Sequence, residues 1–254
     1  LALNGIKTVV VGLDTQCSIT NVALPAPEAS SLEELKELRK LRGGLYHLLE
    51  QDGVDLSDVI MHTDLPTLDL IPETGHLGKL ERVLDQAVGR EQYFSKKLIP
   101  LLSEYEVVIF DNSPAWNHLV KASLACATTV ISPVGCDAGT IDVLESNMET
   151  VKAFKENAEL DWRNFLMLPT LIEPNKLSQQ IYAGYLTQFP EYIIPHPIRR
   201  AVVGQEAQVV RKSVLEYGPN SQLASDYYNA ICAIWNRICD SQTEELNGGS
   251  KARN

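Results

Sequence analysis

The sequence predicts an α/β fold that is doubly wound, with a mostly parallel central sheet flanked by helices. Three short apolar runs, at residues 6–13, 107–110 and 128–133, lack the polar alternation of strands that face water on one side. Such runs are typical of strands buried on both faces of a parallel sheet. Helix-like segments at 116–126 and 141–157 alternate with them, which indicates repeated βαβ units.

The remaining elements follow from weaker patterns. Further strands are predicted at residues 68–72, 165–171 and, least clearly, 191–194. Amphipathic helices are predicted at 31–49 and 223–239, and one or two more helices over 79–102. No repeat or internal linker interrupts these elements, so the sequence predicts one domain over residues 1–240. Residues 241–254 are polar and Gly/Ser-rich, and we expect a frayed tail there.

Composition excludes several classes of protein. The chain has 254 residues, of which 44% are hydrophobic and 22% are charged, so it is neither collagen-like nor wholly disordered. Its net charge of −11 means that nucleic acid would have to be held by a local basic patch. No apolar run reaches the ~20 residues that span a bilayer. The five cysteines form no CxxC pair, so we expect free thiols in an intracellular protein.

Two aspartates follow predicted strands directly. Asp14 comes after the first apolar run and Asp111 after the second. Ligands of doubly wound folds bind beyond the carboxyl ends of the strands, so both residues fall where a ligand is expected. In phosphate-handling proteins one such carboxylate anchors Mg²⁺ and another orients the attacking water. The alternative is structural, because aspartate is also a common helix cap and turn former.

Four segments, in order, carry a resemblance to a known family. Residues 1–20 resemble the segment that follows the P-loop in ParA-type ATPases, the deviant-Walker partition ATPases of the MinD/ParA superfamily, and 105–116 resemble their Walker B strand. Residues 128–144 are similar to the next strand, and 195–231 to the C-terminal run of the partition branch. The resemblance extends over nearly the whole chain, and it implies a P-loop NTPase-like fold.

The resemblance also implies roles for individual residues. Asp14 matches the switch I aspartate that positions the hydrolytic water, and Asp111 matches the aspartate that binds Mg²⁺ through its waters. Thr170, Pro195 and His196 fall where the family contacts adenine, although His196, between two prolines, also fits a simple turn. Residues in the region used for sequence-independent DNA binding are Arg199, Arg200, Arg211 and Lys212. A solvated surface is the alternative for this basic cluster.

A family member would be a Mg²⁺-dependent ATPase that dimerises on ATP and binds nonspecific DNA. A ParB-like or other cargo-adaptor protein would stimulate hydrolysis, and the cargo would be a plasmid, a chromosome or a protein body. The resemblance therefore implies ATP and Mg²⁺ as cofactors and a cytoplasmic, nucleoid-associated protein. A MinD-like membrane-cycling ATPase would need a Lys-rich amphipathic C-terminal helix, and the C-terminal residues are polar instead. Ligases resembling dethiobiotin synthetase are a more distant alternative.

The sequence departs from the family in three places. No GxxxxGK[ST] loop occurs in the 254 residues, and this loop supplies the N–H groups that hold the phosphates. We expect the loop to be encoded upstream of Leu1; without it, the sheet would lack its central strand, and the alternative is a non-enzymatic binding or regulatory module. Gly12 stands where many members carry an additional Asp, so that carboxylate is missing. The signature lysine precedes the P-loop, and Lys152 either reaches a partner's nucleotide instead or is a solvated helix-face residue.

Overall fold

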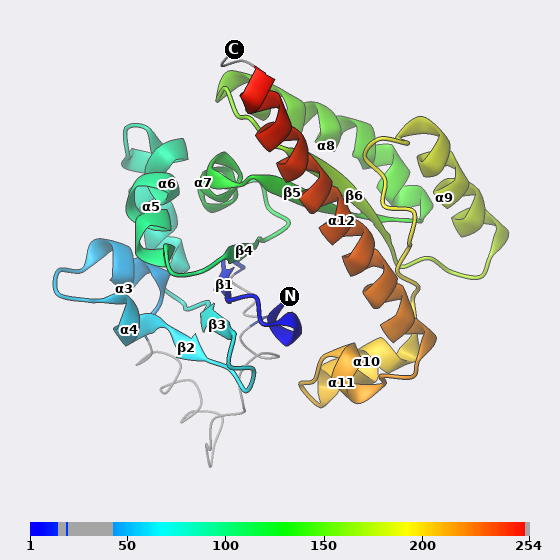
Figure 1. Ribbon diagram of the computed structural model, residues 1–254, viewed down its shortest axis with the longest axis horizontal. Helices are drawn as coiled ribbons and strands as arrows, with labels where there is room; N and C mark the ends of the chain where they lie inside the picture. Colours follow the sequence, from blue (N-terminus) through cyan, green and yellow to red (C-terminus); the bar gives the residue numbers. More distant parts are fainter. Residues whose placement is uncertain (15–18, 20–42, 252–254) are drawn as a thin grey trace. The chain divides into compact units, whose positions relative to one another are not determined.

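The computed structural model describes residues 1–14, 19 and 43–251 of the chain. These residues form two compact units, unit 1 up to Cys126 and unit 2 from Ala127 onward (Figure 1). Each unit has its own sheet and its own buried core. The single domain predicted over residues 1–240 stays a prediction beside these two units.

Unit 1 contains a four-stranded sheet in the order β2-β3-β1-β4. The central strand β1 (Thr8–Gly12) pairs in parallel with β3 (Leu68–Ile71) on one side and with β4 (Val107–Asp111) on the other. Strand β2 (Met61–His62) adds to β3 in the antiparallel direction. The strands predicted at 6–13, 68–72 and 107–110 are therefore confirmed, whereas β2 is too short to leave a sequence pattern.

The helices of unit 1 pack leucine side chains against β1. Val9 and Val11 of β1 are completely buried in one core cluster with leucines of the helical segments. The range 79–102, for which one or two helices are predicted, holds several helical segments, because Gly89 takes a left-handed conformation with φ of 69° between two of them. The helical segments are η1 (Ala2–Asn4), α3 (Leu45–Glu50), α4 (Leu56–Val59), α5 (Leu77–Gln86), η2 (Arg90–Gln92), α6 (Tyr93–Lys97), η3 (Ile99–Leu102) and α7 (His118–Cys126).

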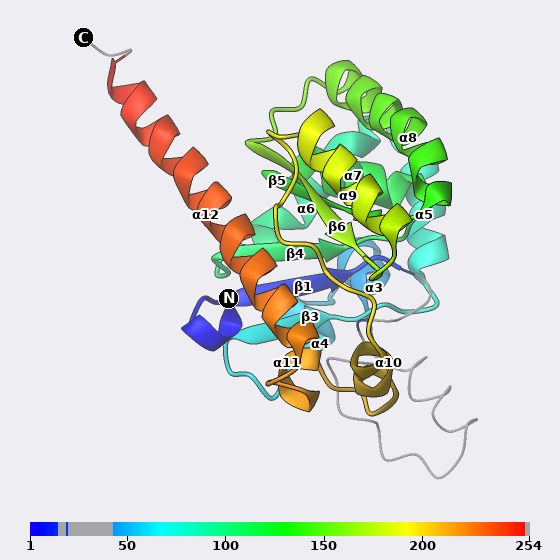
Figure 2. The ribbon, with the colours of Figure 1, turned by 90° about the vertical axis from the view of Figure 1, so that its right-hand side faces the viewer.

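Unit 2 has helices on both faces of a parallel strand pair. Strand β5 (Thr129–Gly135) pairs with β6 (Asn164–Thr170), as the sequence predicts. Met167 of β6 belongs to the core cluster under α8 (Ala138–Asn157) and α9 (Lys176–Gln188), and its neighbour Leu166 to the cluster under α12 (Gln222–Lys251). Figure 2 shows these helices on opposite sides of β5 and β6. The short helices α10 (Val202–Val209) and α11 (Val214–Tyr217) precede α12.

Three predicted elements differ from the structure or lie partly outside it. Residues 191–194 form no strand and contribute only an isolated bridge between Ile193 and Met167. The helix predicted at 31–49 lies outside the described residues except at its end, which falls in α3. Helix α12 continues past the boundary at residue 240 to Lys251, where we expected a frayed tail, because Gln, Glu and Leu in 242–246 are good helix formers. No described helix combines the length and apolarity needed to cross a bilayer.

Two strands that the sequence predicts to be buried on both faces lie at sheet edges in the described part of the chain. Among the described residues, β4 pairs only with β1, and β5 pairs only with β6. Ile109 of β4 is 41% exposed and Ile131 of β5 is 44% exposed, although both lie inside apolar runs. Each run is therefore more apolar than its partial burial among the described residues would require.

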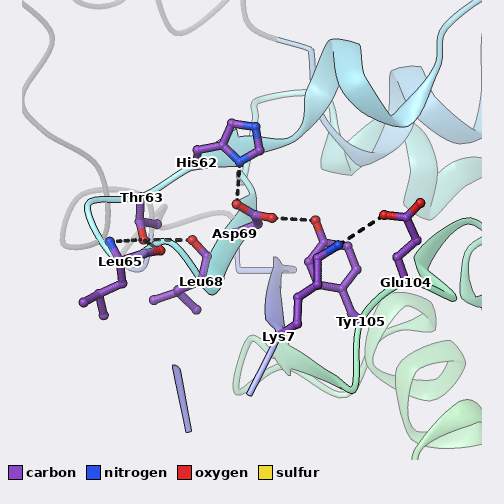
Figure 3. Close-up of polar contacts among 8 residues, drawn as sticks. All are labelled: Lys7, His62, Thr63, Leu65, Leu68, Asp69, Glu104 and Tyr105. Carbon is purple, nitrogen blue, oxygen red and sulfur yellow. Dashed lines mark hydrogen bonds and ion pairs between the residues drawn. The ribbon is translucent and has the colours of Figure 1, made fainter. Parts of the chain in front are cut away.

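A polar network closes the end of the unit 1 sheet where β1 begins (Figure 3). Asp69 of β3 is only 7% exposed, and its carboxylate accepts a hydrogen bond of 2.6 Å from the Tyr105 hydroxyl and lies 2.6 Å from Nδ1 of His62. Burial, together with the hydrogen bond to Asp69, raises the pKa of Tyr105 well above its ordinary value. Lys7 lies over the Tyr105 ring and pairs with Glu104 at 3.1 Å. This network joins β2, β3 and the residues before β4.

We expect Asp69→Ala to lower the free energy of unfolding by about 1–3 kcal/mol, because it leaves the half-buried Tyr105 hydroxyl without its acceptor. In a Tyr105→Phe background, Asp69→Ala should lower the free energy of unfolding by less, since no Tyr105 hydroxyl is left without an acceptor. Urea unfolding of the four variants of this cycle measures the difference. Glu104→Ala, which breaks only an exposed ion pair, should cost about 0–1 kcal/mol. An equal decrease in the free energy of unfolding for Asp69→Ala in both backgrounds would contradict the proposed role of the Tyr105–Asp69 hydrogen bond.

Candidate functional site

The carboxyl ends of β1 and β4 place the two predicted aspartates at one edge of the unit 1 sheet. Gly12 is the ladder partner of Asp111. The N–H of Leu13 donates to the carbonyl oxygen of Asp111 at 2.9 Å, and the Leu13 side chain is buried in the core. Asp14 follows immediately. The fold therefore fixes the backbone of both residues through parallel strand pairing, while their roles stay predictions.

A third carboxylate, Glu73, lies at the same edge. It follows β3 after a single proline, and only 4% of its surface is exposed. Its Oε1 accepts a hydrogen bond of 3.3 Å from the N–H of Ile19. Glu73 is absent from the residues predicted for the site, although it comes directly after the strand predicted at 68–72, as Asp14 and Asp111 come directly after theirs.

The Glu73 carboxyl group occupies the space beside Gly12. A Cβ atom at Gly12 would lie 2.4 Å from Cδ, 2.5 Å from Cγ and 2.9 Å from Oε1 of Glu73, which are closer than real contacts. Any larger residue at position 12 would therefore displace Glu73. Position 12 lacks the additional Asp of many family members, and the carboxyl group of Glu73, which follows β3, occupies the space beside it.

The acidic residues repel one another. Burial raises the pKa of Asp111 above its ordinary value of 3.8, and the charges of Glu73 and Asp14 raise it further. A divalent cation would relieve this repulsion, and carboxylate oxygens are the donors that Mg²⁺ prefers. Within the described part of the chain, no three acidic, histidine or cysteine side chains are grouped closely enough to ligate a metal directly. The carboxylates that repel one another suit a divalent cation, and Mg²⁺ usually keeps several of its own waters in protein sites.

Unit 2 brings together the three residues predicted to contact adenine. Thr170 ends β6. The N–H groups of Ile194 and Ile198 donate to backbone carbonyls of β6, both at 2.8 Å, and so hold the intervening residues beside this strand. Pro195 and His196 lie between these two bonds and are exposed. Pro195 and His196 are therefore accessible beside the end of β6, and their contact with adenine stays a prediction.

The basic residues differ in how they are held. Arg199 forms a fork with Asp226 of α12, with Nε–Oδ2 at 2.6 Å and Nη2–Oδ1 at 2.8 Å, and it also donates to Gln222. Arg200 pairs with Glu173 at 3.0 Å and is exposed. The guanidinium of Arg199 therefore stabilises the contact between its segment and α12, which the sequence does not reveal.

The other predicted basic positions lie on helices or directly after them. Arg211 and Lys212 follow the end of α10, and Lys212 is exposed. Lys152 lies on α8 with 76% of its side chain exposed, 4.0 Å from Glu156 one turn along the helix. Such a pair is typical of a solvated helix face.

Comparisons with known proteins agree with this architecture. Residues 1–163 match the AAA domain family. The cell division protein PomZ of Myxococcus xanthus is 28% identical over 185 residues, which cover 72% of this chain and 58% of PomZ. The sporulation initiation inhibitor protein Soj of Bacillus subtilis is 26% identical over 72% of both chains. The structure of apo McdA from Cyanothece superposes with a TM-score of 0.74 at 18% identity, covering 91% of this chain and 88% of McdA.

These similarities confirm the P-loop NTPase-like α/β fold that the sequence predicts. They do not assign a role to any single residue. The chain spans less than two thirds of the length of PomZ, so the activity of that whole protein does not transfer directly.

The raised pKa of Asp111 predicts a pH-dependent stability. Because the pKa is higher in the folded than in the unfolded chain, the charged carboxylate destabilises the fold at pH values above the folded pKa. Asp111→Asn should therefore raise the Tm of the metal-free protein at pH 7. The difference from the unsubstituted protein should disappear as the pH falls through the raised pKa to below 3.8.

Differential scanning calorimetry across this pH range measures the effect. Asp52→Asn is the matched control, since it removes the same charge from an exposed position and should leave the Tm nearly unchanged. An Asp111→Asn protein that is less stable than the unsubstituted one at pH 7 would contradict the repulsion.

Proposed function

The chain belongs to the ParA-type branch of the MinD/ParA family of AAA-domain partition ATPases, and on this premise we propose that it is a Mg²⁺-dependent ATPase that positions a cargo. ATP binding would drive dimerisation, and the dimer would bind nonspecific DNA over the nucleoid in the cytoplasm. A cargo-adaptor protein would stimulate hydrolysis and release. The cargo would be a plasmid, a chromosome or a protein body.

One observation carries this proposal, namely the pairing that brings Asp14 and Asp111 to the ends of neighbouring parallel strands. Asp111 would hold Mg²⁺ through its waters, and Asp14 would orient the water that attacks the γ-phosphate. When bound, Mg²⁺ would neutralise charge on the phosphate oxygens. The acidic environment of Asp111 supports a cation site, because a cation would remove the repulsion among Asp14, Glu73 and Asp111.

The proposed chemistry also needs a phosphate-binding loop, which the 254 residues do not contain. Such a loop follows a strand in proteins of this fold class. In the part of the chain that the structure describes, one edge of β4 has no strand partner and Ile109 on it is exposed, which leaves room for an additional strand at this side of the sheet. The activity is therefore proposed for the complete gene product.

For DNA binding, we propose Arg200, Arg211 and Lys212 as phosphate contacts, with Arg199 in a supporting role. The charge of Arg199 is largely engaged by Asp226, whereas Lys212 is exposed. Contacts from lysine and arginine to phosphates carry no sequence information, which fits nonspecific binding. Pro195, His196 and Thr170 are proposed to lie against the adenine ring.

Asp14→Ala and Asp111→Ala should each reduce ATP hydrolysis by the complete gene product at least about 100-fold, since each removes a group that acts on the transferred phosphoryl group. Steady-state phosphate release measures this, and binding of a fluorescent ATP analogue shows whether affinity survives. Asp52→Ala, at an exposed position of the same unit, is the matched control and should retain full activity.

Hydrolysis that is indifferent to both substitutions would remove the proposed mechanism. A complete gene product that binds no ATP would favour the alternative function, that of a non-enzymatic binding or regulatory module with the same fold.

Arg211→Ala combined with Lys212→Ala should weaken binding to duplex DNA equally at all sequences. The slope of log affinity against log salt concentration should fall by about one per lost phosphate contact. Fluorescence anisotropy with two unrelated duplexes over a range of salt concentrations measures both quantities. Lys155→Ala with Lys176→Ala removes the same charge from unit 2 and should leave binding nearly unchanged.

Arg199→Ala should act differently from the other basic substitutions. It removes the guanidinium that pairs with the largely buried Asp226 carboxylate, which would keep only the bond from the N–H of residue 199, and it should lower the free energy of unfolding by roughly 1–3 kcal/mol. If instead it weakens DNA binding more than the double variant without lowering the Tm, the supporting role is wrong.

A further inference from the structure

Arg211 and Lys212 lie in the turn that joins α10 to α11 in unit 2 (Figure 1). Arg211 takes a left-handed conformation with φ of 56°. Its N–H donates to the carbonyl oxygen of Gln208 at 3.1 Å, and the N–H of Lys212 donates to that of Ala207 at 2.9 Å. Together these two bonds form the Schellman motif, which ends many helices. The backbone of both basic residues is therefore fixed to the end of α10.

Helix α11 begins directly after the turn with a capping box formed by Ser213 and Glu216. The Oγ of Ser213 accepts a hydrogen bond from the N–H of Glu216 at 3.2 Å, and the Glu216 carboxylate accepts the N–H of Ser213 at 3.0 Å. The Ser213 hydroxyl donates to the same carboxylate oxygen at 2.6 Å. The box satisfies N–H groups that have no partner inside the helix. The Glu216 carboxylate is thus held at the start of α11 by two bonds from one residue.

This carboxylate lies within electrostatic reach of the basic pair. The hydrogen bonds from Ser213 lower the pKa of Glu216 below its ordinary value, and the positive charge of Lys212 contributes to the shift. With the other residues that the structure describes, the side chains of Arg211 and Lys212 form no hydrogen bond or ion pair. A Glu216 carboxylate released from Ser213 would therefore be free to pair with Lys212.

The second carboxylate of this stretch is engaged as well. Residues 199–217 include two acidic side chains, Glu206 and Glu216. The hydroxyl of Tyr217 on α11 donates to Glu206 on α10 at 3.4 Å. Each carboxylate close in sequence to the basic pair thus has a partner that carries no charge. Arg199 and Arg200 differ, because both pair directly with acidic side chains.

We propose that Ser213 is a positioning residue of the DNA-binding surface, which holds the Glu216 carboxylate at the start of α11 and so keeps Arg211 and Lys212 available for phosphates. This inference rests on the proposed function, because the DNA contacts are assigned there. Neither Ser213 nor Glu216 touches DNA in this scheme. A cation without an acidic partner binds a phosphate without first breaking an ion pair, which favours binding.

A double-mutant cycle in the complete gene product tests the inference. Ser213→Ala changes no charge but releases Glu216, and it should weaken binding to duplex DNA by about two- to fivefold, the range expected of an exposed ion pair. In a Glu216→Gln background no carboxylate is released, so Ser213→Ala should change the affinity by less than about 1.5-fold. Fluorescence anisotropy with a labelled duplex measures the four affinities. An equal loss in both backgrounds would indicate a merely structural cap and would overturn the inference.

Titration of the Glu216 carboxyl group by NMR gives a readout that does not depend on DNA. In Ser213→Ala the pKa of Glu216 should rise toward its ordinary value of 4.5, because the largest cause of its lowered pKa is removed. An unchanged pKa would show that Ser213 does not hold the carboxylate, and it would overturn the inference.

Ser221 supplies the matched control. Directly before α12, its Oγ accepts the N–H of Ala224 at 3.1 Å. Ser221→Ala therefore removes a serine cap from the same unit without releasing a carboxylate, and it should leave the DNA affinity within about 1.5-fold. A loss as large as that of Ser213→Ala would contradict the role of Glu216.

The two proposals fail in different ways. If the unsubstituted complete protein binds no duplex DNA, the proposed DNA contacts fail and this inference fails with them. If the unsubstituted protein binds DNA and Ser213→Ala binds it equally well, only this inference fails.

Discussion

The parallel pairing of β1 with β4 is the constraint on which the candidate site depends. It aligns Gly12 with Asp111, and the N–H of Leu13 donates a hydrogen bond to the Asp111 carbonyl oxygen. The backbone directly before Asp14 is thereby held next to the end of β4. Pairing of β1 with β3 on the other side brings Glu73 to the same edge. Like charges gather there only because hydrogen-bonded ladders and a buried leucine core hold the three strands in register. The fold thus tolerates a local repulsion that a bound cation would remove.

The two glycines at this edge show how packing and chemistry are connected. Gly12 gives room to the Glu73 carboxyl group and Gly44 gives room to Thr74. Neither glycine needs its conformational freedom, since both act through the missing side chain. A small residue at the end of a strand therefore indicates that another group approaches closely, and here that group is acidic. The departure of position 12 from the pattern of its family becomes understandable as one half of a pair.

Much of the fold could be predicted from the sequence, because β1, β4, β5 and β6 are apolar runs without alternation. Strand β2 has two residues and leaves no pattern, while 191–194 has a strand-like composition but only a single bridge. Asp14 and Asp111 could be found because each ends a clear strand. The role of Arg199 could not, since its partner Asp226 lies 27 positions away on α12. Charges read from sequence show which groups are present but not which of them are already neutralised.

Within the described residues, β4 and β5 each have one edge without a strand partner, and this affects how the polypeptide can self-associate. An exposed strand edge with β-branched residues is a template for strand addition by another chain, and Ile109 and Ile131 are both exposed on such strands. Among the described residues these edges carry no strand partner, so strand addition at either of them would give oligomers that form without nucleotide. Self-association of this polypeptide could then arise from the unpaired N–H and C=O groups of the strand edges. A dimer that forms only with nucleotide would be distinguished from such edge pairing by its dependence on nucleotide.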